Sequence, residues 1–303
     1  AAMQQSQDNE SAGARYTQLQ MNAQAAISAM ELYEAFGETE YLSHGVSFAR
    51  ILMACQASAV DPSFSIPLRG YFYENETHER IQTYYHRSYE HAPIKAFAML
   101  YRLAPEHEDA ARWKNSLELY REYVALTSRT VPYGLLPNGI YELDNTDFST
   151  ITHEGARAAG APSLEEYNAQ VRNGIRLNDR FYLRVFPVAY QFRGFHATLM
   201  GRALAAMELA RALNDREIKQ VAVRQMEWIL GCNPFAVSSM YGEGHDYHPL
   251  YAPMSPQLVG AVPVGFETFE NEDQPFYPMQ NNAAYKEVWV HTTCRMMWLI
   301  AML

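Results

Sequence analysis

The sequence predicts an all-α fold, an (α/α) toroid or barrel of helical hairpins, as a single domain over residues 1–303. Three observations predict it. Apolar residues recur every three or four positions in seven segments, as on one face of an α-helix. Short connections join these segments in pairs, so the two members of a pair must be antiparallel neighbours. Repetition of the hairpin, about 90 residues per unit, favours a toroid or solenoid over a compact bundle.

The first two hairpins lie in the N-terminal half of the chain. A helix that ends at Gly37 is followed after two or three residues by a second helix, which runs to about residue 58. The third helix covers about 88–103. After the break Ala104-Pro105, the fourth carries its apolar stripe on Trp113, Leu117, Tyr120 and Val124.

The third hairpin pairs a helix over 193–213 with a helix over 215–230. The seventh and last helix is expected to begin near Tyr285 and to end with the chain. Two smaller elements are also expected between the hairpins. One is a short helix from Ser163 to Arg172, and the other is a brief extended segment at Gly70-Tyr71-Phe72-Tyr73.

The connections between the hairpins, at about 59–87, 130–192 and 231–284, are far longer than the usual loop of about 4–6 residues. Helices that alternate in direction place every second connection at the same end of the assembly. We therefore expect the three long connections to meet on one face. The N-termini of the third, fifth and seventh helices, with their unpaired amide groups, would point at that face.

Composition excludes several classes of function. Lys and Arg number 24 and Asp and Glu 34, and the formal net charge of −10 disfavours nucleic-acid or anionic-membrane partners. The apolar stretch 288–303 is interrupted by His291 and Arg295 and is too short to span a bilayer. The three cysteines form no zinc motif, His245 and His248 give only a weak metal signal, and phosphate-loop motifs are absent, so no cofactor or metal is expected.

Carboxylate chemistry remains, and Glu287 is its best-placed candidate. We expect this residue one turn into the last helix, at the end that faces the long connections. Tyr285, Val288 and Trp289 beside it would remove water from the carboxyl group and favour its protonated form. A solvated glutamate that helps to cap the helix is the alternative interpretation.

Two segments of the chain resemble glycoside hydrolase family 9. Leu230-Gly231-Cys232-Asn233-Pro234 is similar to the family's Leu-Gly-x-Asn-Pro, and Glu287-Val288-x-Val290 is similar to its Asn-Glu-Val-Ala-Ile. The closest likeness is to a poorly characterised bacterial branch that carries Met240-Tyr241-Gly242-Glu243-Gly244 and a segment like 285–291. The resemblance implies a barrel of six helical hairpins, inverting hydrolysis of a β-linked glycan, and Glu287 as the proton donor.

The chain also departs from the family's pattern. Lys286 and Thr293 stand where the family has asparagine, which puts a cellulose substrate in doubt, and the Asp-Ala-Gly-Asp motif of the catalytic base is missing. Six hairpins need twelve major helices, of which the sequence predicts seven. We infer that the chain is the C-terminal part of a catalytic domain whose N-terminal part carries the base, with an immunoglobulin-like module possible further upstream. Such an enzyme would be secreted or periplasmic.

The resemblance implies a groove for an oligo- or polysaccharide at the long connections. Tyrosine rings would stack on the apolar faces of the sugars, and His86, Arg87 and Arg184 would bond their hydroxyl groups. The expected substrate-binding residues are Tyr73, Tyr84, His86, Arg87, Arg184, Tyr241, His245 and Tyr247.

Three alternatives to hydrolysis remain open. A polysaccharide lyase would use the Tyr/His/Arg set at 84–87, and a sugar epimerase would pair His86 with His245. The third alternative, from another class, is a glycan-binding module without catalysis.

Overall fold

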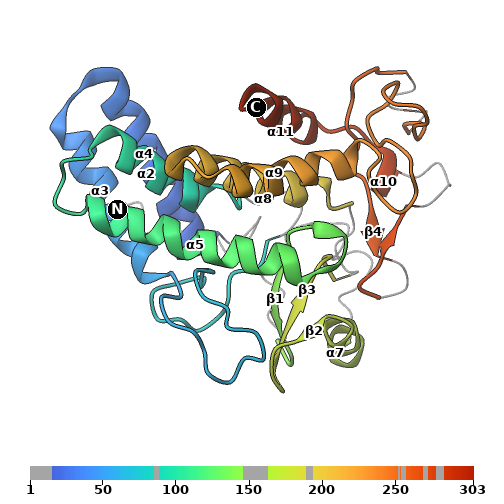
Figure 1. Cartoon of the computed structure of the whole chain (residues 1–303), viewed down its shortest axis with the longest axis horizontal. Coiled ribbons are helices and arrows are strands. Elements are labelled where there is room, and N and C mark those ends of the chain that lie inside the picture. The colour runs from blue at the N-terminus through green and yellow to red at the C-terminus, as the bar shows by residue number, and fades with distance from the viewer. Residues whose placement is uncertain are drawn as a thin grey trace.

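The computed structural model describes residues 16–84, 89–145, 163–188, 194–251, 253, 257–268, 272–277 and 283–303. It confirms a mostly helical chain (Figure 1). The long helices are α2 (Gln18–Phe36), α3 (Thr39–Ala54), α4 (Ala92–Leu103), α5 (Ala110–Thr130), α8 (His196–Leu213), α9 (Arg216–Ile229) and α11 (Val290–Ala301). The shorter ones are η1 (Pro132–Gly134), α7 (Leu164–Arg172) and α10 (Ala283–Lys286).

Local signals fix most helix ends where the sequence predicts them. Thr17 and Gln20 form a capping box at the start of α2, and Gly37 ends that helix with a positive φ of 72°. Asp215 caps α9 through the N–H groups of Glu217 and Ile218. The third predicted helix begins later than expected, at Ala92, because Pro93 is accepted only in the first turn of a helix.

The helices form two layers. Among the described residues, α2, α4, α8 and α11 pack one against the next in a row, and α3, α5 and α9 pack on the outside of this row. Helix α8 lies in the middle, and almost every side chain from His196 to Ala210 is buried. Each of the three predicted hairpins is present as an antiparallel pair, so the arrangement is that of an incomplete (α/α) toroid.

The long connections meet one another, as their expected common face requires. Ser65 of the first connection donates its backbone N–H to the carbonyl of Leu177 in the second (2.6 Å). The second meets the third where the N–H groups of Val185 and Phe186 donate to the carboxylate of Asp273, both at 2.9 Å. These contacts join segments that are far apart in the sequence.

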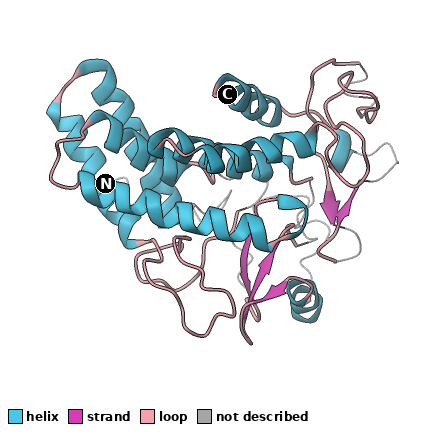
Figure 2. Ribbon diagram, viewed as in Figure 1, coloured by secondary structure: helices cyan, strands magenta, loops and turns pink. Residues whose placement is uncertain are grey.

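Small β-sheets that the sequence analysis did not predict lie in two of these connections. Strands β1 (Gly139–Glu142), β3 (Phe181–Arg184) and β2 (Ile175–Arg176) form an antiparallel sheet in the order β1-β3-β2. Strands β4 (Glu267–Thr268) and β5 (Pro275–Phe276) form a second antiparallel pair. Figure 2 shows these strands at one end of the helical body. The extended segment expected at 70–73 is present, with Phe72 paired to Gln56 and Tyr73 to Ile81.

The last helix differs from the prediction of one continuous helix from Tyr285. Helix α10 ends at Lys286, and α11 begins only at Val290. Continuing the helix would require the carbonyls of Lys286 and Glu287 to accept from residues four positions later. They accept instead from the N–H groups of Tyr251 (3.0 Å) and Val264 (3.0 Å). Backbone partners from the third connection therefore break the helix at 287–289.

Candidate functional site

Glu287 lies in the break between α10 and α11, and its backbone is hydrogen-bonded on both sides. Its N–H donates to the carbonyl of Ala283 (3.3 Å), and its carbonyl accepts from Val264 (3.0 Å). The side chain is half-buried, and its Oε2 accepts a hydrogen bond of 2.5 Å from Nε1 of Trp289. The sequence analysis placed this residue one turn into the last helix; the structure places it directly after α10, in the break before α11.

A loop stretch of the third connection, residues 261–266, holds the backbone of Glu287 against the start of α8. His196 donates its backbone N–H to the carbonyl of Val264 (3.1 Å), and its Nδ1 lies 3.1 Å from the carbonyl oxygen of Pro263. Burial lowers the pKa of His196 to about 3, so its imidazole is neutral at physiological pH. The carboxyl group of Glu287 is thus carried on a frame that is anchored in the core.

Aromatic and basic side chains lie next to Glu287 and the stretch 261–266. The ring of His248 stacks on Tyr277 with 3.8 Å between centroids. Burial, together with the charge of Lys286, lowers the pKa of His248 to about 4. Lys286 is itself buried, and this burial lowers the pKa of its ammonium group. His248 is therefore present as neutral imidazole at pH 7.

Three of the predicted sugar-binding residues come from one segment of the third connection. The rings of Tyr241 and Tyr247 meet edge to face with 5.2 Å between centroids. Tyr247 is 41% exposed, and His245 is exposed beside it. An exposed aromatic ring that a second ring holds in one orientation can stack on the apolar face of a sugar.

The other predicted contacts have different surroundings. Tyr73 is half-buried and stacks on His78 with 4.0 Å between ring centroids. Tyr84 is buried, and its carbonyl accepts from Nδ2 of Asn138 (3.4 Å). His86 and Arg87 lie outside the described residues.

Arg184 was expected to bond sugar hydroxyl groups, but the structure gives its side chain a different role. The residue is 0% exposed, and its guanidinium is used inside the protein. Its Nε donates to the carbonyl of Phe186 (3.1 Å), another nitrogen donates to the carbonyl of Gln170, and a third lies 3.6 Å from the carboxylate of Asp273. The side chain cross-links the second and third connections, and a contact with sugar would require it to leave the core.

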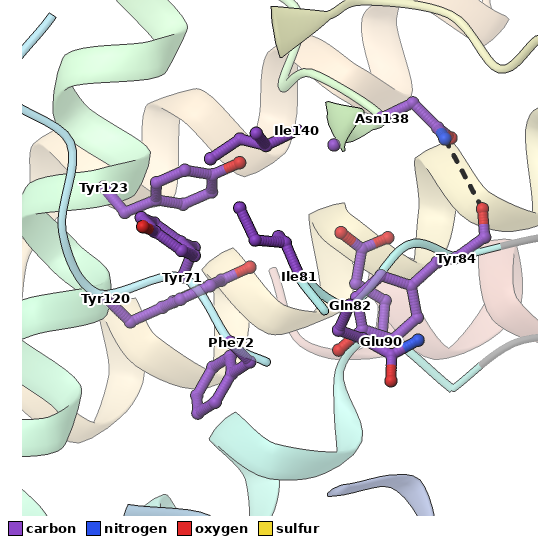
Figure 3. Close-up of a pocket in the computed structure, with 11 residues that line it drawn as sticks. Tyr71, Phe72, Ile81, Gln82, Tyr84, Glu90, Tyr120, Tyr123, Asn138 and Ile140 are labelled. Atoms are coloured by element: carbon purple, nitrogen blue, oxygen red, sulfur yellow. Dashed lines mark hydrogen bonds between the residues drawn. The ribbon is translucent and has the colours of Figure 1, made fainter. Parts of the chain in front are cut away.

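The sequence analysis missed a buried polar cluster that includes Glu90. A cavity of about 30 Å³ is open between this residue and a group of tyrosines, and it can hold one or two water molecules but no sugar. Tyr71, Tyr120 and Tyr123 enter from one side and Gln82, Tyr84 and Glu90 from the other (Figure 3). No local pattern marks Glu90, because the groups around it come from α5, α8, α11 and the first two long connections, which are far apart in the sequence.

Among the described residues, Arg202 of α8 forms an ion pair with Glu90. One of its nitrogens lies 3.8 Å from Glu90 Oε2, and the same nitrogen donates to Oδ1 of Asn138 (2.9 Å). Its Nε and Nη2 have no hydrogen-bond partner among the described residues. Burial raises the pKa of Glu90 to about 8, against the opposing effect of Arg202 and Arg295. The carboxyl group is therefore largely protonated at neutral pH.

In the described part of the chain, no group of three or more His, Cys, Asp and Glu side chains is arranged to hold a metal ion. None of its helices is long and apolar enough to cross a membrane.

Comparison with known proteins gives a likeness of fold. No family model and no curated protein matches the chain. The cellulase Cel9M of C. cellulolyticum matches with a TM-score of 0.51 and 14% identity over 97% of this chain and 51% of that one. Its complex with cellobiose matches with a TM-score of 0.51 and 15% identity, over 98% and 52%. The chain thus spans about half the length of these structures, and over that half it has the helical toroid fold of Cel9M.

Proposed function

We propose that this chain is part of a glycoside hydrolase that cleaves a β-linked glycan with inversion at the anomeric carbon, with Glu287 as its general acid. The observation that carries the proposal is the position of Glu287. This carboxyl group is held by core-anchored backbone of the third connection, the same connection that carries Tyr241 and Tyr247, in a fold like that of a cellulase. The complex of Cel9M with cellobiose supports a β-glucan or its oligosaccharides as the substrate class.

The reaction needs two carboxyl groups. Glu287 would give its proton to the glycosidic oxygen as the bond from that oxygen to the anomeric carbon breaks, and the bonding electrons would remain on the leaving oxygen. A water molecule would attack the anomeric carbon from the opposite face and lose its proton to a carboxylate about 6.5–9.5 Å from the acid. We assign that base to the part of the catalytic domain that precedes this chain. Buried Glu90 has no access to a sugar in this structure.

The sugar would be bound mainly by the third connection. Tyr241 and Tyr247 are proposed as stacking platforms, with His245 as a partner for sugar hydroxyl groups. Tyr73, Tyr84, His86 and Arg87 remain proposed contacts from the first connection. Arg184 is not one of the proposed sugar contacts, because its side chain is fully buried.

The proposed partner of the chain is the N-terminal part of the same catalytic domain. Helices α2 and α11 are the two ends of the inner row, and each exposes an apolar stripe. The stripe on α2 contains Met21, Leu32 and Phe36; that on α11 contains Val290, Cys294, Met297 and Ile300. The only charged residue of α11, Arg295, is buried. Such faces fit the apolar sides of further helices that close the toroid.

An upstream immunoglobulin-like module and secretion or periplasmic export also belong to this proposal.

The test is hydrolysis by the protein that carries the whole toroid. Reducing-sugar release from a panel of β-glucans, with the anomer of the new end followed by NMR, should show an inverted product. Glu287→Gln removes the transferable proton and keeps the shape of the side chain. Turnover should fall by about 10²–10⁴-fold, with binding of the oligosaccharide little changed.

The same assay separates the alternatives. Undiminished hydrolysis by the Glu287→Gln variant would refute the assignment of the acid. An unsaturated product formed without water would identify a lyase. Binding across the whole panel without any product would identify a glycan-binding module.

A further inference from the structure

We propose that Trp289 is a positioning residue for Glu287. Its indole N–H would occupy Oε2 of the carboxyl group, so that the acid form carries its transferable proton on Oε1. The inference rests on the proposed role of Glu287 as general acid. Its direct evidence is the hydrogen bond of 2.5 Å between Trp289 Nε1 and Glu287 Oε2.

The break between α10 and α11 makes this contact possible. In a continuous helix, residues two positions apart point in nearly opposite directions and do not meet. Trp289 has extended backbone angles, φ −121° and ψ 141°, and the neighbouring Val288 pairs with Pro263. Side chains two positions apart in an extended segment lie on the same side. Glu287 and Trp289 therefore face one another only because the helix is interrupted.

The indole is also held in place from the start of α11. The carbonyl of Trp289 accepts from the N–H groups of Thr292 (3.2 Å) and Thr293 (3.3 Å). Its ring meets the ring of His291 edge to face, with 5.4 Å between centroids. A donor fixed in this way costs little reorganisation when charge develops on the carboxylate.

The hydrogen bond changes in strength during the proposed reaction. Before proton transfer, Oε2 is the carbonyl oxygen of a neutral acid. As the proton leaves Oε1 for the glycosidic oxygen, Glu287 becomes a carboxylate, and a hydrogen bond to an ionised acceptor is about twice as strong as a neutral one. An interaction that strengthens in the transition state raises kcat more than it lowers KM.

The experiment removes the N–H donor and keeps an aromatic ring. Trp289→Phe should lower kcat by about tenfold with little change in KM. Because the lost donor favoured the carboxylate over the acid, the basic limb of the kcat/KM pH profile should move to higher pH by about one unit. Trp298→Phe, in the following helix α11 and packed on His91, is the matched control and should change neither quantity.

A second replacement covers the case in which Trp289→Phe does not fold. Incorporation of benzothienylalanine at position 289 keeps the bicyclic shape and lacks the N–H, and it should give the same shift. If both replacements leave the profile unchanged while Glu287→Gln is inactive, the inference on Trp289 is wrong and the proposed acid stands. If Glu287→Gln keeps its turnover, the proposed acid and this inference fail together.

Discussion

Glu90 places a carboxyl group between α4, α8 and α11, where burial raises its pKa to about 8 from an ordinary value of 4.5. Between these two pH values the folded chain binds more protons at this site than the unfolded chain does. Stability contributed by the neutral carboxyl is therefore greatest at low pH and falls as pH rises through this window. Arg202 opposes the effect by favouring the ionised form.

Glu90→Gln should consequently flatten the dependence of stability on pH. Relative to wild type, the variant should gain stability between pH 5 and pH 8, by an amount on the order of 1–3 kcal/mol, because a shift of one pKa unit corresponds to about 1.4 kcal/mol. The free energy of unfolding, measured with denaturant at pH 5 and at pH 8, tests this prediction. Glu108→Gln, which alters an exposed carboxyl group, should follow the wild-type curve. Parallel curves for Glu90→Gln and wild type would contradict the raised pKa.

At the scale of elements, the loop stretch 261–266 connects the core to the proposed acid. Gly265 makes its close approach to α8 possible. A Cβ atom at this position would lie 2.2 Å from the ring of His196, and the backbone φ is +94°. The N–H of Gly265 also donates to the carbonyl of Tyr285 (2.7 Å), two residues before Glu287. Only glycine allows these three segments to pack so closely.

Gly265→Ala should therefore lower both stability and activity. We expect an unfolding free energy lower by about 2–4 kcal/mol, since the methyl group forces backbone and ring apart. Gly260→Ala is the matched control, because its φ of +80° is similar but no atom lies within 4 Å of the added Cβ. That variant should lose only about 1 kcal/mol, from backbone strain. Equal losses in the two variants would show that packing on His196 is unimportant.

At the scale of the whole molecule, α2 and α11 stand at the two ends of the inner row, and each exposes apolar side chains in the part of the chain that the structure describes. Val290 is 79% exposed and Met297 63% exposed on α11, a degree of exposure that apolar helix residues rarely keep in a finished fold. The match to Cel9M covers nearly all of this chain and about half of that one. Additional helices packed on α2 and α11 would account for both observations.

Met297→Lys tests this in the protein that carries the whole toroid. A charge placed against packed helices should lower the unfolding free energy by about 2 kcal/mol or more. Gln220→Lys places the same charge on the exposed face of α9 and should have no measurable effect. If the two variants unfold alike, the α11 stripe has no partner. Dissociation of a dimer by Met297→Lys, seen by sedimentation, would instead identify a second copy as the occupant.

The candidate site was predictable only in part. Glu287 is proposed as the acid because its flanking residues form a recognisable local motif, and the meeting of the long connections followed from the alternation of hairpins. The hydrogen bond from Trp289 was not predictable, because the sequence indicates a continuous helix there. Arg184 was assigned to sugar binding from its type and position in a loop. In the folded chain its guanidinium is buried against the carbonyls of Gln170 and Phe186 and the carboxylate of Asp273, which lies far away in the sequence.

By itself, the sequence determined the helices, their hairpins and the toroid class, because helix periodicity, capping residues and short turns act between near neighbours in the chain. Tertiary structure alone decided where the last helix breaks, that Glu90 is enclosed and largely protonated, and that Arg184 is structural. Each of these depends on groups that only folding brings together. They are the N–H groups of Tyr251 and Val264 at the helix break, the residues of α5, α8 and α11 around Glu90, and the carbonyl of Gln170 and the carboxylate of Asp273 around Arg184.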